Sequence, residues 1–550
     1  MSDKQRDIAG ALAAIALGLV GFFVLVGWTT LIPTNIGWLD FADRAMHTLG
    51  WMFFRQAPWG VPPGLNPRLG LELANSIGLV DGLPLLALPA KLLSPWLPHP
   101  VQYWGVWLLC CFALQALFAW LIARELGAGR ILALIAAGFA LITPAYMFRV
   151  EMHLALSSHW TILAALWLSV RRDAPPRWAW PLLVALTAGI HAYLLAMVMA
   201  LWLAACAERL LGQRMRWRDA ALELAAGLAA ALLILWAAGF FVSGTTGTYG
   251  YGAYKLNLLW PLLTYKGWSQ IVPDLPHTRY DYEGLSFLGI GILALLALSI
   301  ASGAILRLRA AATRRWAPLT LTLLALLLFA LSKDVAFADR ELFVVPLPRP
   351  IDSLASTFRS TGRFVWPLLY LVTIGAVVLI GTRLRAAFAI PLALAAFAAQ
   401  AADSGPALLT FSERLAPVSD HWQSPLQSPF WQRAAAAGYS RIRVIPVVSN
   451  PGTDWKALGY FAATHDMGID SVYLGRVDAK DLAALRARER KVLETGDFDP
   501  GTLYILDPRS ALAAQQHVAP GDLLARIDDR IVFAKGGAPL ADGLALSPVF

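Results

Sequence analysis

Long apolar segments recur along most of this chain, and they constrain its fold more than any other feature. A helix needs about 20 mostly apolar residues to cross the hydrocarbon core of a bilayer. The 550 residues are 58% hydrophobic and only 15% charged, whereas soluble domains carry about 25% charged residues. We predict an α-helical polytopic membrane domain with about eleven spans, at residues 9–28, 104–123, 131–148, 157–170, 178–191, 192–207, 219–242, 285–305, 316–332, 364–381 and 386–401.

Lysine and arginine residues gather in one set of short connections between these segments. These connections lie on the same side as Lys4 and Arg6, and short cytoplasmic loops are enriched in basic residues. The N-terminus is therefore expected in the cytoplasm, with an uncleaved first helix. The long loops 29–103, 243–284 and 333–363 then face the outer side, together with the tail.

The composition changes after residue 401, where the tail alternates short strand-like and helix-like runs. This pattern predicts a soluble α/β domain over residues 402–550, following a transmembrane domain over residues 1–401. We expect strands at 441–448, 470–474, 503–506 and 530–533, and helices at 454–466 and 478–492.

Charge and cysteine content exclude several classes of function. The net charge of +9 comes from basic residues in short loops between spans, so no nucleic-acid partner is expected. All three cysteines, Cys110, Cys111 and Cys206, lie inside apolar runs. They are expected to pack as small apolar side chains, and they predict neither a disulfide nor a metal site.

The first long outer loop carries acids close to the expected membrane surface. On a helix, Asp40, Asp43 and His47 would share one face. A carboxylate there could deprotonate an acceptor hydroxyl or bind a divalent cation such as Mg or Mn. The alternative is that Asp43 simply pairs with His47, one turn later. Asp81, farther along, is a second acid or a helix N-cap, and capping is the favoured role.

Histidines and arginines mark the other outer segments. His153 and His159 flank the outer start of the fourth span, and His191 lies at the outer tip of a short hairpin. They could bind a metal or a phosphate, or be structural. Arg359 and Arg363, four residues apart, would face the same way on a helix. Paired guanidinium groups suit a phosphate or diphosphate, and the alternative is a salt bridge to Asp352 or to loop acids.

Several short patterns occur together in a fixed order. They are Asp43-x-x-x-His47-x-x-Gly50-Trp51-x-Phe-Phe-Arg55, Ser76-Ile77 with Asp81-x-x-Pro84-Leu85, His153 with His159-Trp160, His191-x-Tyr193, Glu283-Gly284 with Leu288-Gly289, and Phe358-Arg-Ser-x-Gly-Arg-Phe-x-Trp-Pro367. Over residues 10–400 they resemble a family of bacterial multi-pass membrane proteins. That family is itself similar to the GT-C superfamily of membrane glycosyltransferases.

The resemblance implies a GT-C-like fold in a bacterial inner membrane, with the tail in the periplasm. It implies transfer of a sugar from a polyprenyl-phosphate donor to an envelope glycan, lipid or protein acceptor on the outer side. Asp43 falls on the family acid, with Asp40 as an alternative, and Arg359 and Arg363 fall on the motif before the late span. The substrate-binding set would be His47, Arg55, Asp81, His153, His159, His191, Glu283, Arg359 and Arg363.

Two departures from the superfamily concern a metal. The adjacent acid pair of the superfamily is absent, and Gly82 follows Asp81 where the family pattern has serine. Use of a cation is therefore left open. Two other classes of function are also open: a glycan or lipid transporter, and a non-catalytic envelope assembly protein. A transporter is expected to carry ionisable residues deep in its spans, and here the spans are nearly free of them.

Overall fold

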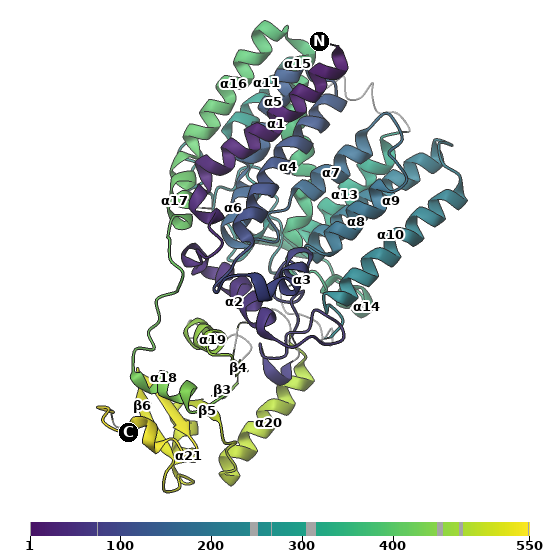
Figure 1. Cartoon of the computed structure of the whole chain (residues 1–550). Coiled ribbons are helices and arrows are strands. Elements are labelled where there is room, and N and C mark those ends of the chain that lie inside the picture. The colour runs from purple at the N-terminus through teal and green to yellow at the C-terminus, as the bar shows by residue number, and fades with distance from the viewer. Residues whose placement is uncertain are drawn as a thin grey trace. The chain divides into compact units, whose positions relative to one another are not determined.

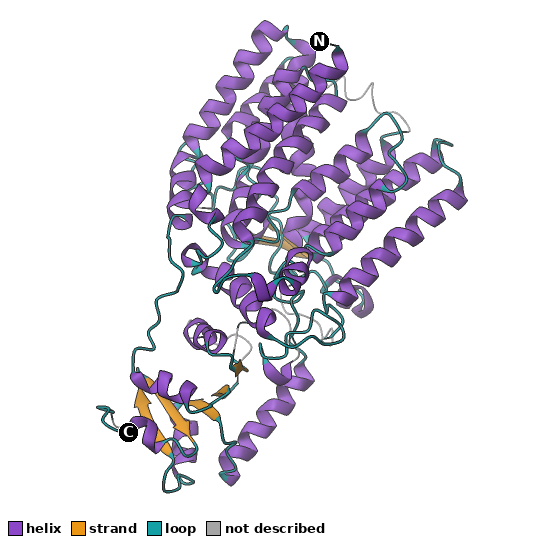
Figure 2. Cartoon of the chain, in the orientation of Figure 1, coloured by secondary structure: helices purple, strands orange, loops and turns teal. Residues whose placement is uncertain are grey.

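A computed structural model describes residues 2–73, 75–242, 251–265, 267–303, 315–447, 455–471, 473, 477–547 and 549. The described chain is mostly helical and forms two compact units (Figures 1 and 2). The first, called the helical unit here, comprises residues 1–38, 101–234 and 247–418. The second, called the loop–tail unit, comprises residues 39–100, 235–246 and 419–550.

The helical unit contains the apolar helices that the sequence predicts. Its elements are α1 (Asp3–Leu25), α4 (Trp104–Glu125), α5 (Arg130–Leu141), α6 (Pro144–Met152), α7 (Trp160–Val170), α8 (Ala179–Ala188), α9 (Ala192–Leu211), α10 (Trp217–Ala237), α11 (Ile290–Ala301), α13 (Ala317–Leu331), α15 (Trp366–Arg383), α16 (Ala386–Asp403) and α17 (Gly405–Leu415). Between α13 and α15 lie a hairpin of strands β1 (Asp334–Phe337) and β2 (Arg340–Val344), then α14 (Arg349–Ala355).

The class of a multi-pass membrane protein is confirmed, but the number of spans is smaller than predicted. Six of the described helices are long and apolar enough to cross a membrane, or seven if α5 and α6 count as one broken span. These two helices meet at 46°, because Pro144 begins α6 and removes a backbone donor there. Four other expected spans, α7, α8, α11 and α13, have only 10–17 residues and fall short of about 30 Å of hydrocarbon.

Basic residues in the short connections pair with acids near helix ends of the helical unit. Asp7 in the first turns of α1 pairs with Arg124 and Arg130, which flank the connection between α4 and α5. Arg315, just before α13, lies 3.6 Å from Glu208 near the end of α9. Within each of these two groups, helix ends that the charge pattern assigned to one side of the membrane are neighbours.

The loop–tail unit contains the α/β part of the chain. Its elements are α2 (Ala42–Gln56), α3 (Pro84–Leu92), α18 (Pro429–Ala436), β3 (Arg441–Ile445), α19 (Trp455–Thr464), β4 (Gly468–Ile469), α20 (Ala479–Thr495), β5 (Thr502–Leu506), α21 (Pro508–Gln515), β6 (Leu523–Ile527) and β7 (Arg530–Ala534). The strands form one sheet in the order β4-β3-β5-β7-β6, with β4, β3 and β5 parallel.

Most of the predicted tail elements are present, with two differences. Strand β4 ends at Ile469, before the predicted run 470–474, of which residues 472 and 474 lie outside the described residues. Strand β6 was not predicted. It pairs with β7 through a turn at Asp528 and Asp529, which both have positive φ angles, and such turns favour hairpins.

The first long loop completes the sheet of the tail. The N–H of Gly70 donates to the carbonyl oxygen of Ile469 at 2.8 Å, and the N–H of Ile469 donates to the carbonyl oxygen of Arg68 at 2.9 Å. The loop thereby pairs with the outer edge of β4, which would otherwise expose unpaired backbone groups. This pairing explains why residues 39–100 and the tail form one compact unit.

Candidate functional site

A buried cluster of charges lies in the helical unit, where two loops meet α6. Glu283, in a 3-10 turn (Asp281–Gly284), accepts hydrogen bonds from Nε and Nη2 of Arg363 at 3.2 and 2.6 Å. Nη1 of Arg149 lies 3.1 Å from the same carboxylate, and its Nη2 donates to the Glu283 carbonyl oxygen at 2.7 Å. All three residues are buried, so the cluster holds two positive charges and one negative charge away from water.

Electrostatics keep the Glu283 carboxylate ionised. Burial raises its pKa, but the charges of Arg363 and Arg149 and the hydrogen bond from Arg363 outweigh burial. The pKa of Glu283 therefore lies well below the ordinary range of a glutamate. The carboxylate cannot act as a proton donor near neutral pH, and its role is to orient the two guanidinium groups.

Two of the sequence motifs meet at this cluster. The Arg363 guanidinium lies 4.9 Å from the ring centre of Tyr193, whose hydroxyl accepts a hydrogen bond from the N–H of Ser360 at 2.9 Å. His191 caps α9 by accepting from the N–H of Tyr193. Nδ1 of His153 lies 3.1 Å from Nη1 of Arg149. The structure thus brings His153, His191, Glu283 and Arg363 together.

His159 has a different environment. Its side chain is fully buried among helices, with Nδ1 2.7 Å from the hydroxyl of Tyr370 and the ring 4.1 Å from that of Trp366. This position fits the structural alternative for His159 better than the predicted substrate-binding role. It packs inside the bundle because the N-terminus of α7 lies beside α15.

Arg359 and Arg363 do not share a helix face, contrary to the prediction. The short helix α14 ends at Ala355, and the next turn begins only at Thr361. Ser360 between them has φ −96° and ψ 69°, which is not helical. As a result, Arg363 points to Glu283, whereas the half-buried Arg359 has its guanidinium 5.9 Å from the ring centre of Tyr254. Arg363 therefore pairs with a loop acid, and Asp352 pairs with Lys333 at 2.8 Å.

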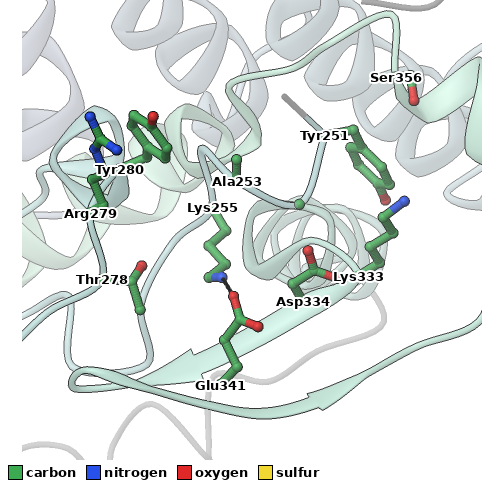
Figure 3. Close-up of a pocket in the computed structure, with 11 residues that line it drawn as sticks. Tyr251, Ala253, Lys255, Thr278, Arg279, Tyr280, Lys333, Asp334, Glu341 and Ser356 are labelled. Carbon is green, nitrogen blue, oxygen red and sulfur yellow. Dashed lines mark hydrogen bonds and ion pairs between the residues drawn. The ribbon is translucent and has the colours of Figure 1, made fainter. Parts of the chain in front are cut away.

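Beside these residues the two loops enclose a cavity of about 580 Å³ (Figure 3). Its charged lining consists of three cations and two acids: Lys255, Arg279, Lys333, Asp334 and Glu341. Two rings, Tyr251 and Tyr280, also line it. Small-molecule sites typically measure about 300–1,000 Å³ and combine aromatic walls with a few polar groups.

The cavity and the charge cluster share a wall. The N–H of Gly362 donates to the Tyr254 carbonyl oxygen at 3.1 Å, and a Cβ at Gly362 would lie 2.8 Å from Cα of Gly284. The same Cβ would lie 2.9 Å from the Lys255 carbonyl oxygen. Only glycine permits this approach, which places Arg363 and Glu283 directly behind the segment that carries Lys255.

The sequence did not point to the cavity residues or to Arg149. The cavity residues are single charges in two loops of ordinary composition, and residues 243–250 of the first loop lie outside the described residues. A signal did exist for Arg149. It stands at the expected outer end of a span, where arginine is disfavoured, and this is the same argument that selected Arg363.

The acids of the first loop belong to the loop–tail unit and do not form the predicted helical row. Helix α2 begins at Ala42, which has φ +45°, so Asp40 precedes the helix and cannot share its face with Asp43 and His47. Asp40 pairs with Lys456 at 2.7 Å. Asp43 is half-buried in the first turn of α2, where the helix dipole favours an ionised carboxylate, and His47 is buried one turn later.

Asp81 does not cap α3. The N-cap residue of that helix is Leu83, whose alkyl side chain cannot accept a capping hydrogen bond. Asp81 lies two residues earlier, in a turn where Asp81 and Leu83 both adopt positive φ angles. The predicted capping role is therefore wrong.

Arg55 acts as a clamp inside its own loop. Its guanidinium donates to Oγ and the carbonyl oxygen of Ser94 at 2.9 and 3.0 Å, and to the carbonyl oxygens of Leu97 at 2.8 Å and Pro98 at 2.6 Å. Four bonds from a buried guanidinium leave little capacity for a substrate. This geometry favours a structural role over the predicted substrate-binding role.

The clamp can be tested by replacing Arg55 with lysine. Lysine keeps the charge but loses the planar fork, so we expect a loss of stability of about 1–3 kcal/mol, measured as a lower unfolding midpoint in detergent. Arg433→Lys is the matched control, because Arg433 also binds two carbonyl oxygens but at an exposed position. Unchanged stability with weakened substrate binding would instead assign Arg55 to a ligand site.

The possible divalent cation gains no support from the part of the chain that the structure describes. Within those residues, no group of three or more His, Cys, Asp or Glu side chains is placed to hold a metal ion.

The fold and the cavity together define a class: a multi-pass helical membrane protein with a polar cavity built from its loops and an α/β domain at its C-terminus. Residues 15–405 match the domain of unknown function DUF6311, and residues 430–535 match the DUF6311 C-terminal domain. The chain belongs to the DUF6311 family. No curated protein matches the sequence.

Proposed function

We propose that this protein is a membrane glycosyltransferase that takes a sugar from a polyprenyl-phosphate donor and transfers it to a cell-envelope acceptor. The observation that carries the proposal is the cavity formed by residues 251–280 and 333–356. It combines tyrosine rings with three cationic side chains. The second loop follows the apolar helix α13 directly, and in the first loop the N–H of Leu256 donates to the Ala330 carbonyl oxygen of α13 at 2.9 Å. A donor of this kind has an apolar tail, an anionic phosphate and a sugar ring, and each part has a counterpart in this arrangement.

The cations of the cavity suit the phosphate of such a donor. Lys255 is paired with Glu341 at 2.7 Å, and Lys333 is paired with Asp352 at 2.8 Å, so both ammonium groups are held in place. Arg279 at the rim is exposed. Fixed positive groups stabilise the charge that develops on a leaving phosphate, and they cost no reorganisation during the reaction.

The buried cluster behind the cavity has a positioning role in this proposal. Because Glu283 binds Arg363 and Arg149 together, Arg363 is not available as a bidentate phosphate ligand. One excess positive charge nevertheless remains beneath the cavity wall and favours an anion there. Of the two arginines in the late motif, Arg359 is the better candidate for direct contact with the donor.

Asp43 is the proposed general base on the acceptor hydroxyl. The assignment rests on the resemblance and on the position of Asp43 in the first turn of α2. Asp40 is the weaker alternative, because its carboxylate pairs with Lys456. Asp43 belongs to the loop–tail unit and the cavity to the helical unit. The role of Asp43 as base and the role of the cavity as donor site are therefore tested by separate substitutions.

The proposed location is a bacterial inner membrane, with the N-terminus in the cytoplasm. The support is the excess of basic residues in the short connections, of which Arg124 and Arg130 pair with Asp7 near the N-terminus. The cavity loops and the tail are then periplasmic, where lipid-linked donors would meet envelope acceptors.

The decisive experiment is a profile of glycans and lipid-linked sugars in cells that lack the protein. We expect a missing sugar that the wild-type gene restores and Asp43→Asn does not, although the variant protein reaches the membrane at normal levels. Asp420→Asn is the control, because Asp420 is an exposed acid of the same unit. A sugar restored equally by Asp43→Asn would remove the catalytic acid and favour a transporter or an assembly protein.

A further inference from the structure

The hairpin β1–β2 and the helix α14 expose an apolar surface that no other described part of the helical unit covers. Every residue of β2 is exposed, and α14 has no buried residue. Phe343 is 56% exposed and Leu354 is 76% exposed. The apolar members of this surface, called the hairpin patch here, are Phe337, Leu342, Phe343, Val344, Val345, Ile351 and Leu354. Exposed apolar patches of this kind mark interaction sites.

The length of α13 indicates what covers the hairpin patch. Arg315 and Trp316 precede the helix, and such residues anchor a span at the membrane boundary. Its 15 residues extend only about 22 Å, less than the roughly 30 Å of hydrocarbon. The chain therefore leaves α13 before it reaches the far boundary, and the hairpin that follows at once begins close beneath that boundary.

The hairpin is suited to the boundary of the bilayer and not to its centre. Strand β2 pairs only with β1 among the described strands, so its outer edge presents unpaired backbone groups that hydrocarbon could not satisfy. Two cations, Arg340 and Arg349, and two acids, Asp339 and Glu341, are exposed beside the apolar side chains. Apolar residues next to arginine match an interface that offers acyl chains on one side and phosphate headgroups on the other.

We propose that the hairpin patch is a membrane-interface element, with β2 and α14 seated between the headgroups and the acyl chains of the leaflet next to the cavity. The same hairpin borders the cavity, because Asp334 and Glu341 line it (Figure 3). The lipid surface thus holds one wall of the cavity at a defined depth. This proposal concerns the bilayer itself and is independent of any transferase activity.

Depth-dependent fluorescence quenching tests the proposal in the full-length protein. The cysteines Cys110, Cys111 and Cys206 are replaced by alanine, and Phe343→Cys carries an environment-sensitive fluorophore in lipid nanodiscs. Nitroxides are placed on the headgroup, high on the acyl chain, or at the chain end. We expect a blue-shifted emission and quenching by the shallow acyl nitroxide about twofold or more above that by the chain-end nitroxide.

Asp529→Cys is the matched control, because Asp529 is an exposed turn residue of the hairpin β6–β7. It should respond to aqueous iodide and not to lipid nitroxides. Leu354→Cys repeats the measurement at α14 if Phe343→Cys does not fold. A Phe343 label quenched by iodide as strongly as the control would overturn the proposal, and so would strongest quenching from the chain end.

Discussion

Replacing Glu283 with glutamine is expected to destabilise the helical unit by about 3–5 kcal/mol, because two arginines then share a buried site without a negative charge. Breaking a buried ion pair by removing one partner costs far more than the pair contributes as a whole, since the remaining charge stays away from water. Here two charges remain. The change is measured as a lower unfolding midpoint of the purified protein in detergent.

Asp352→Asn is the matched control for Glu283→Gln. Asp352 forms an ion pair with Lys333 in the same unit, and both side chains are partly exposed, at 37% and 27%. Pairs of this kind typically contribute about 0–1 kcal/mol. Equal effects of the two substitutions would contradict the buried cluster described here. Adding Arg363→Met to Glu283→Gln should recover part of the lost stability, because it removes one of the two uncompensated charges.

The pH dependence of this cluster follows from the low pKa of Glu283. A carboxyl group whose pKa is depressed in the folded state contributes stability above its unfolded pKa of about 4.3, and loses it as the pH falls toward the folded pKa. The difference in stability between wild type and Glu283→Gln should therefore be constant above about pH 5 and shrink in acid. If the stability difference between wild type and Glu283→Gln grew in acid, the pKa of Glu283 would be raised by folding and not lowered.

Replacing Arg443 with alanine is expected to destabilise the sheet of the loop–tail unit by about 1–3 kcal/mol, because the fully buried Asp470 and its neighbour Glu72 lose a charged hydrogen-bond donor. Nη2 of Arg443 also lies 2.6 Å from Glu72, which joins the first loop to the tail. Hydrogen exchange in residues 441–445 would report the loss directly. Arg488→Ala is the matched control, because Arg488 pairs with the same Glu72 but is 49% exposed, and it should cost about 0–1 kcal/mol.

The effect of Arg443→Ala should depend on pH. Burial raises the pKa of Asp470 to about 7, although the N–H of Val444 and the charge of Arg443 oppose burial. Burial likewise raises the pKa of Glu489 to about 7. An acid with a raised pKa keeps its proton where the unfolded chain has lost it, so it lowers stability as the pH rises from about 4 to 7. Without Arg443 the pKa values rise further and the decline continues to higher pH, so the variant should be closer to wild type near about pH 5 than near about pH 8.

The resemblance to glycosyltransferases and the geometry of the cavity point to different residues. The resemblance selects Asp43, Arg359 and Arg363, whereas the cavity is lined by Lys255, Arg279 and Lys333 among others. These two sets can be separated by experiment. Loss of the sugar with Asp43→Asn and normal transfer with Lys333→Ala would support the acid and reject the cavity as the donor site, and the reverse pattern would do the opposite.

The sequence by itself determined the class of the protein. Apolar segments must leave water, and within lipid every backbone group must be satisfied inside the segment, so helices are the only outcome for such runs. Local composition therefore predicted the apolar helices and strands β3, β5 and β7 of the tail. Helix length was less predictable, because Pro144 and the capping turns shorten segments whose hydropathy alone looks continuous.

Only the tertiary structure decided which charges meet. Glu283 binds Arg149 and Arg363 from segments 134 and 80 residues away, and no local pattern specifies such a pairing. Residues 68–70 extend a sheet whose strands lie in the tail, because an unpaired edge accepts any backbone that reaches it. A turn at Ala42 likewise separated Asp40 from Asp43. Long-range packing and single backbone angles decide these pairings and the start of α2, and neither can be predicted from the spacing of residues in the sequence.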